Sequence, residues 1–81
     1  MTEKQFIEVG NYITLLSSRI TTYCPERFCI ENSLFEYIKL VGNTCCLKLK
    51  ADTSTGVPHF KTLADIKTYI NSFKLNGVKR L

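Results

Sequence analysis

The chain has 81 residues, a hydrophobic fraction of 44% and a formal net charge of +4 at pH 7. A chain of this length can bury one small core, so we expect residues 1–81 to form a single domain. Its apolar runs are far shorter than the ~20 residues of a membrane helix, and MTEKQF lacks the pattern of a signal peptide. The sequence therefore predicts a soluble, cytoplasmic protein with no membrane partner.

The charge is unevenly distributed along the chain. Residues 1–36 contain five acidic and three basic residues, whereas residues 37–81 contain eight basic and two acidic residues. A basic second half favours an anionic partner such as nucleic acid, although surface charge of this size also serves solubility alone.

The first predicted element is a helix. Thr2 and Gln5 have the spacing of a capping box, so the helix is expected to begin at residue 3. It is expected to end by about Tyr23, because the residue before Pro25 avoids the helical region. A stripe of apolar residues at steps of three and four is predicted to face the core: Phe6, Val9, Ile13, Leu16 and Ile20.

Residues 34–51 predict a β-hairpin, around which we expect the rest of the chain to be arranged. Gly42 and Asn43 form a two-residue loop that tolerates positive φ, and runs rich in Tyr, Ile, Val and Leu flank it. The predicted cross-strand pairs are Val41 with Thr44, Leu40 with Cys45, Lys39 with Cys46, Ile38 with Leu47 and Tyr37 with Lys48.

The two faces of this hairpin are expected to differ, because side chains alternate along a strand. The predicted core face carries Leu34, Ile38, Leu40, Cys45, Leu47, Leu49 and Ala51, with Glu36 as its one acid. The opposite face combines lysines with aromatic rings: Phe35, Tyr37, Lys39, Val41, Thr44, Cys46, Lys48 and Lys50.

Shorter elements flank the hairpin. Residues 27–30 favour a strand, residues 31–33 favour a turn, and residues 57–61 favour an edge strand. Thr62 predicts the cap of a second helix, which buries Leu63, Ile66, Ile70 and Phe73 and stops at Asn76 and Gly77. The order predicts an α+β fold: an N-terminal helix, a central antiparallel β-hairpin or three-stranded sheet, and a C-terminal helix.

The four cysteines are expected to be free thiols, because no export signal is recognised. They are Cys24, Cys29, Cys45 and Cys46. Neighbours on a strand point to opposite faces, so the last two are not expected to share a metal ion. A zinc site would combine Cys24, Cys29, one of the adjacent pair and His59. Since half of the usual paired-ligand pattern is missing, we expect no metal, and a small zinc-stabilised domain is a less favoured alternative.

No set of residues indicates an enzyme. The one histidine, His59, lies beside a proline, the glycines are scattered, and no serine lies in a nucleophile motif. Neither a cofactor nor a small-molecule substrate is indicated. Cys24 is the one thiol for which reactivity is predicted, because the neighbouring Arg27 can stabilise a thiolate.

The lysine-bearing face predicts nucleic-acid binding, because lysines meet phosphates and aromatic rings stack on exposed bases. The predicted contact residues are Phe35, Tyr37, Lys39, Lys48 and Lys50, with Lys79 and Arg80 in a basic tail. A hairpin followed by FKTLADIKTYI is similar in layout to small three-stranded DNA-binding domains of the integrase type, which implies a DNA target. The motifs of those domains are missing, and the N-terminal helix is additional.

Two other interpretations of this face stay open. If the second helix packs on it, Phe35, Tyr37 and Val41 form a second small core, with lysine stems at its rim. If these side chains are exposed, they form an apolar patch for a protein partner or a homodimer. The second interpretation would suit a small inhibitor, adaptor or viral accessory protein.

Overall fold

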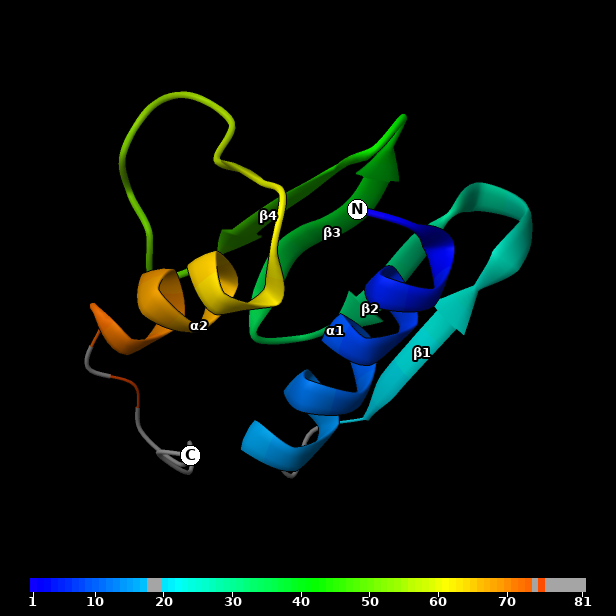
Figure 1. Ribbon diagram of the computed structural model, residues 1–81. Coiled ribbons are helices and arrows are strands. Elements are labelled where there is room, and N and C mark those ends of the chain that lie inside the picture. Colours follow the sequence, from blue (N-terminus) through cyan, green and yellow to red (C-terminus); the bar gives the residue numbers. More distant parts are fainter. Residues whose placement is uncertain (18–19, 74, 76–81) are drawn as a thin grey trace.

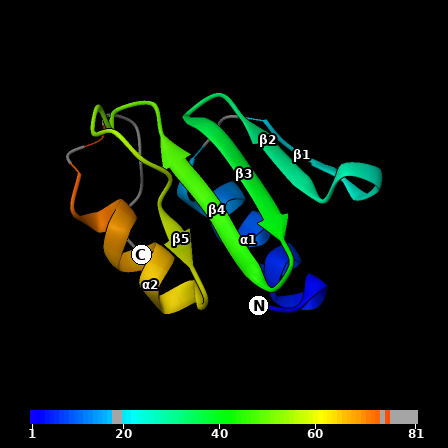
Figure 2. The ribbon, with the colours of Figure 1, turned by 90° about the horizontal axis from the view of Figure 1, so that it is seen from above.

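The computed structural model describes residues 1–17, 20–73 and 75. Helix α1 (Glu3–Leu16) is followed by β1 (Thr21–Cys24), the 3₁₀ turn η1 (Pro25–Arg27), β2 (Cys29–Asn32), β3 (Phe35–Val41), β4 (Thr44–Leu49), β5 (His59–Phe60) and α2 (Leu63–Asn71). The strands form one antiparallel sheet in the order β1-β2-β3-β4-β5 (Figures 1 and 2). The predicted α+β fold is confirmed, with five strands in place of two or three.

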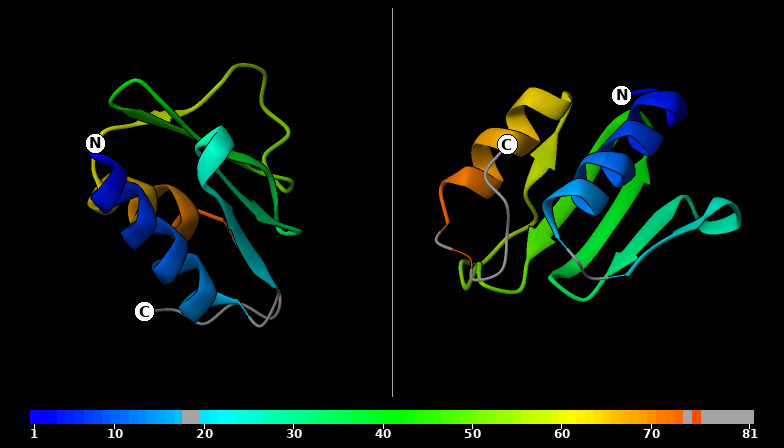
Figure 3. Two further views of the ribbon diagram at one scale, coloured as in Figure 1. Left: turned by 90° about the vertical axis from the view of Figure 1, so that its right-hand side faces the viewer. Right: turned by 90° about the horizontal axis from the view of Figure 1, so that it is seen from below.

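Both helices lie against the same face of the sheet (Figure 3). Side chains from both helices and from this face join one buried cluster, which includes Phe6 of α1, Ile38 of β3, Leu47 of β4 and Ile66 of α2. No helix described in the structure covers the other face. This arrangement excludes the interpretation in which the second helix packs on the lysine-bearing face.

Helix α1 begins at the predicted capping box. The Gln5 N–H donates to Thr2 Oγ1 at 3.2 Å, and the Thr2 N–H donates to Gln5 Oε1 at 2.7 Å. The helix ends at Leu16, well before the predicted limit. Thr21 and the residues after it pair with β2 instead, since β-branched side chains favour strands. Ile20, predicted to be buried, is 86% exposed.

The hairpin of β1 and β2 is not part of the predicted fold. The two strands reverse around η1, which begins with Pro25, and Phe28 completes the turn in the left-handed region with φ 47°. The predicted strand and turn at residues 27–33 are shifted along the chain, since β2 extends to Asn32. Ile30 of β2 packs close to Gly10 of α1, where a Cβ would lie 3.1 Å from Ile30 Cδ1. The small residue in the helix thus allows α1 to lie near this strand.

The central hairpin has the predicted turn and register. Gly42 has φ 63°, and a positive φ at a glycine in the first loop position is typical of a type II′ hairpin turn. All five predicted cross-strand pairs are present, from Val41 with Thr44 to Tyr37 with Lys48.

A β-bulge breaks the alternation at the start of β3. Phe35 pairs with Leu49 while Tyr37 pairs with Lys48, so Glu36 is an extra residue. The bulge turns Phe35 onto the core face, where it is 4% exposed, and leaves Glu36 in solvent. The prediction that Phe35 lies on the lysine-bearing face is therefore wrong.

The second half of the chain contains the predicted edge strand and helix, but both are shorter than predicted. β5 is an edge strand, and Thr62 Oγ1 caps α2 by accepting from the Asp65 N–H at 3.2 Å. Ile66 and Ile70 are buried. Helix α2 ends at Asn71 with Ser72 as its C-cap, so the prediction that it continues to residues 76–77 is wrong. The predicted tail at residues 78–81 lies outside the described residues. In the described part of the chain, no helix has the length and apolarity needed to cross a membrane.

Candidate functional site: the open face of the sheet

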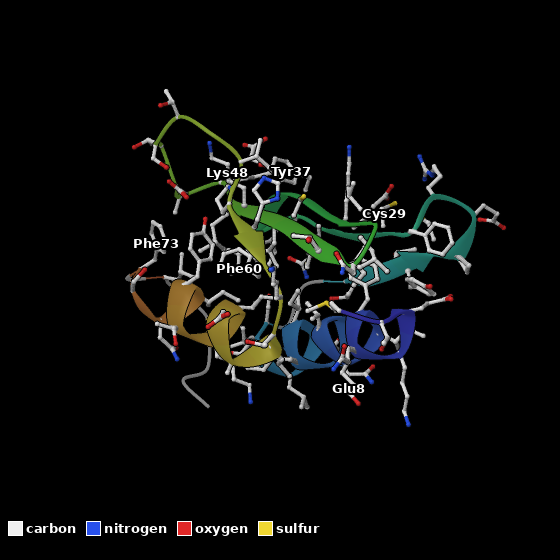
Figure 4. The ribbon with its side chains drawn as sticks, turned by 45° about the horizontal axis from the view of Figure 1, so that its top comes forward. Glu8, Cys29, Tyr37, Lys48, Phe60 and Phe73 are labelled. Atoms are coloured by element: carbon white, nitrogen blue, oxygen red, sulfur yellow. The ribbon has the colours of Figure 1, made fainter. Side chains whose placement is uncertain are left out.

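The face of the sheet turned away from both helices is the candidate site, and we call it the open face (Figure 4). A row of paired residues crosses it, one from each strand, in the order Cys24, Cys29, Lys39, Cys46 and His59. Alternation along the strands adds Thr22, Glu31, Tyr37, Val41, Thr44 and Lys48. Lys39 is at the centre of this row. Cys24 and Cys29 lie on one side of it, and Cys46 and His59 lie on the other.

The predicted lysines have different environments. Lys39 is exposed at the centre of the row, and Lys50 is exposed immediately after β4. The Lys48 ammonium donates to the carbonyl oxygens of Ser54 at 2.5 Å and of Gly56 at 3.4 Å. Lys48 therefore ties the loop after β4 to the sheet, and two of its three donors are engaged. Lys79 and Arg80 lie outside the described residues.

Tyr37 is the one predicted aromatic residue that the structure places on the open face. Its ring is half-buried, and its hydroxyl is buried without a hydrogen-bond partner among the described residues. Burial, followed by the negative charges that Cys46 and Asp52 can carry, raises its pKa above the ordinary 10.0. The open face therefore offers a ring whose hydroxyl points away from solvent.

The loop after β4 is anchored to α2 through Asp52. The Tyr69 hydroxyl donates to Asp52 Oδ2 at 2.6 Å and accepts from the Leu49 N–H at 3.2 Å. The Ser54 hydroxyl and N–H both donate to Asp52 Oδ1, at 2.5 and 3.0 Å. Hydrogen bonds from Ser54 and then from Tyr69 lower the pKa of Asp52 to about 2, while burial and the Asp52 hydrogen bond raise that of Tyr69 to about 12.

This anchor predicts a specific loss of stability in acid. Because the pKa of Asp52 is lower in the folded protein than its ordinary 3.8, its stabilising effect is complete above about pH 4 and is lost as the pH falls towards 2. In Asp52→Asn, the free energy of unfolding should therefore fall less between about pH 4 and pH 2 than it does in the unmodified protein. Denaturant titrations at several pH values measure this fall. An equal fall in Asp52→Asn would contradict the anchoring role.

A cavity of about 500 Å³ lies where β2 and β3 separate. These strands pair at Cys29 and Lys39 and diverge towards the turn that joins them. The cavity wall includes Arg27, Cys29, Glu31, Tyr37 and Lys39, together with apolar atoms from the core side. The open face is therefore hollowed beside its central lysine, and charges of both signs line the hollow.

The four predicted zinc ligands do not converge. Cys24 and Cys29 lie at one end of the row, and Cys46 and His59 lie at the other, with Lys39 between the two pairs. Neighbouring strands are ~4.8 Å apart, so Cys29 and Cys46 are separated by ~10 Å, which is more than one zinc ion with ~2.3 Å Zn–S bonds can span. The alternative prediction of one zinc site that combines all four residues is therefore wrong.

The sequence did predict that the adjacent cysteines face opposite sides. Cys45 lies in the core, and burial raises the pKa of its thiol to about 12. Cys46 lies on the open face with its Sγ 3.4 Å from Nδ1 of His59. Sequence reasoning missed this pair, because it depends on the register of β5, a strand of two residues with no periodicity to read.

The basic charge of the chain is not concentrated in the described part. The described residues comprise seven basic and seven acidic residues, and the excess comes from Arg19, Lys74, Lys79 and Arg80, which lie outside it. Within the described part of the chain, basic and acidic residues are therefore equal in number, and the cations of the open face are those named above.

Comparisons of this chain with protein-family models, with curated proteins and with solved structures found no significant match. The similarity in layout to three-stranded DNA-binding domains also weakens, because the sheet has five strands and carries both helices on one face. The function must therefore be argued from the open face itself.

Proposed function

We propose that this protein is a non-enzymatic module that binds single-stranded nucleic acid on the open face. The observation that carries the proposal is that both helices pack on the opposite face, which leaves the strands around Lys39 uncovered. An uncovered sheet with cations and rings can meet both the phosphates and the unstacked bases of a single strand.

The width of the sheet argues against a double-stranded target. The central hairpin of β3 and β4 has a neighbouring strand on each side. Five strands at ~4.8 Å spacing are ~19 Å across, whereas the major groove of B-DNA is ~12 Å wide. Insertion of this hairpin into the major groove is therefore sterically unfavourable, and a flexible strand lying across the sheet is favoured.

The contacts available on the open face set the expected strength of binding. Lys39 and Lys50 have exposed ammonium groups, and Arg27 is exposed although it pairs with Glu31 at 3.2 Å. Tyr37 is the candidate stacking platform. Three phosphate contacts with a single strand give a slope of about −2 in a plot of log affinity against log salt concentration. We therefore expect weak binding with a shallow salt dependence.

The test is a charge reversal on the open face with a matched reversal on the helices. Lys39→Glu combined with Lys50→Glu should weaken binding of fluorescent single-stranded DNA and RNA by at least about tenfold, measured by anisotropy at ~50 mM salt. Lys4→Glu combined with Lys67→Glu makes the same change in net charge, but on α1 and α2. This variant should weaken nucleic-acid binding much less. Thermal unfolding checks that both variants fold.

Two outcomes would overturn the proposal. Equal losses in both double variants would mean that net charge alone drives binding. No binding of the unmodified protein to any single strand at low salt would remove the function altogether.

A protein partner is the second candidate, favoured by the outer edge of β1. This edge strand lies beside a groove against α1 that is lined by Ile7 and Tyr23, among other residues. Leu15 and Ile20 add apolar surface nearby, 65% and 86% exposed. Such an edge can accept another strand. Sedimentation of the protein without nucleic acid, as part of the same test, should show concentration-dependent dimers if a second copy is the partner.

A further inference from the structure

Cys24 and Cys29 are positioned to react with each other. They are directly opposite each other at the end of the β1–β2 hairpin, so their side chains lie on the same face. Their sulfur atoms and a Glu31 carboxylate oxygen all lie within 4.8 Å of one another. Paired Cα atoms in antiparallel strands are ~4.5–5.5 Å apart, within the ~4.4–6.8 Å that a disulfide requires. The backbone therefore needs no rearrangement to join them.

A guanidinium group lies beside this pair of thiols. Arg27 Nη2 is 3.5 Å from Cys24 Sγ and 3.2 Å from Glu31 Oε1. The turn η1, which begins with Pro25, brings Arg27 back over the hairpin. A cation in contact with a thiol favours the thiolate, which is the nucleophile in thiol chemistry.

The two thiols are not equivalent. Burial, followed by a hydrogen bond with Cys24, raises the pKa of Cys29 and so favours its protonated form. The Arg27 contact is to Cys24. The remaining cysteines are less accessible, since Cys45 is 0% exposed and Cys46 is 7% exposed. The contact with Arg27 and the raised pKa of Cys29 together favour Cys24 as the attacking thiol and Cys29 as the resolving thiol.

We propose that Cys24 and Cys29 form a reversible thiol–disulfide site that reacts with small disulfides such as glutathione disulfide. The Cys24 thiolate attacks one sulfur of the disulfide RSSR, which forms Cys24–S–S–R and releases a thiolate that takes up a proton as RSH. Cys29 then loses its proton and attacks the Cys24 sulfur, which releases the second RSH. In total, two protein thiols are oxidised to one disulfide and RSSR is reduced to two RSH.

A metal ion is the competing ligand for this cluster. Cys24, Cys29 and Glu31 offer two sulfur atoms and one oxygen atom. However, Arg27 already contacts Cys24 and Glu31, and Lys39 is paired with Cys29. A divalent cation would have to displace or oppose these two positive charges, so the geometry favours the dithiol.

The site lies at the edge of the cavity between β2 and β3. Arg27 and Cys29 both line that cavity. A disulfide would replace the Cys24 thiol that Arg27 contacts, so oxidation would leave this guanidinium paired with Glu31 at the edge of the cavity. The redox state of the pair would thereby change the contacts of Arg27 beside the cavity.

The experiment treats the native protein with glutathione disulfide and maps its products by mass spectrometry. We expect one intramolecular disulfide between Cys24 and Cys29, with Cys45 unmodified. Cys29→Ser should stop at a mixed disulfide on Cys24, whereas Cys24→Ser should react much more slowly. Cys46→Ser is the matched control and should react like the unmodified protein.

The role of Arg27 is tested by the rate at which iodoacetamide alkylates Cys24. Arg27→Ala should slow this rate about threefold, a modest factor because the contact is solvent-exposed, and Arg27→Lys should restore most of it. Glu26→Ala, in the same turn, should leave the rate unchanged. Cys45 remains unmodified if the protein stays folded throughout.

Three results would overturn the proposal. One is failure to form the disulfide under conditions that oxidise a simple dithiol. Another is formation of a disulfide that involves Cys46. A third is retention of one equivalent of zinc by the purified protein and its release when Cys24 and Cys29 are alkylated, because the cluster would then be a metal site.

Discussion

Replacing Phe35 with alanine will lower the free energy of unfolding by about 3–5 kcal/mol, which is typical when a large buried aromatic side chain is removed. Phe35 is 4% exposed because the bulge in β3 turns it into the core. A protein of 81 residues has a total stability of about 4–12 kcal/mol, so this variant is expected to lose a large fraction of it. Urea titration followed by circular dichroism measures the change.

The neighbouring acid is the matched control for the bulge. Without the bulge, Glu36 would face the core and Phe35 would face solvent, since side chains alternate. Glu36→Ala should therefore change stability by no more than about 0.5 kcal/mol. If Phe35→Ala does not fold, Phe35→Leu should give a smaller loss in the same direction. A tolerated Phe35→Ala would mean that this bulge is misplaced.

Replacing Ile66 with alanine will cost about 2–5 kcal/mol, because the residue is completely buried between α2 and the sheet. Helix α2 has only nine residues, too few for stability without tertiary packing. The loss should appear as a lower urea midpoint. In contrast, the affinity of the folded protein for nucleic acid should be unchanged, because Ile66 lies on the opposite side of the sheet from Lys39.

An exposed position on the same helix separates packing from helix propensity. Thr68 is exposed and donates its hydroxyl to the Ala64 carbonyl at 3.1 Å within the helix. Thr68→Ala should therefore stay within about 0.5 kcal/mol of the unmodified protein. If Ile66→Ala costs no more than Thr68→Ala, then α2 does not pack on this face, and the argument for an uncovered open face fails.

The elements that sequence reasoning predicted are those with a local signal. Gly42 predicts the hairpin turn, and Thr2 and Thr62 predict where the two helices begin. Each of these features depends only on residues within a few positions along the chain. The register of the central hairpin follows from the turn by counting, which is why all five predicted pairs are found.

The elements that it missed depend on partners distant in sequence. Thr21 and its neighbours follow a helical stripe without interruption, and only pairing with β2 makes them a strand. The bulge has one local signal, the acid Glu36 within an apolar alternation. The sequence alone does not distinguish a single acidic exception from a shift in the alternation of side chains.

For the candidate site, the sequence indicated which residues lie near the surface but not how each is engaged. Lys39 and Lys50 are exposed as predicted, while Lys48 is engaged by loop carbonyls. Lys48 and Ser54 meet because the loop after β4 folds back, and no periodic pattern encodes such a path. The contact of Arg27 with Cys24 was foreseeable, because both residues belong to one short turn.

The placement of both helices on one side of the sheet has a consequence for the evolution of this protein. Only the layer beneath the helices must exclude water for the chain to fold, so residues such as Lys39 and Thr44 carry little of the folding free energy. Mutations on the open face can then accumulate with little loss of folding free energy. A scaffold of this kind can vary its open face while keeping its architecture, because core and surface residues occupy alternate positions on the same strands.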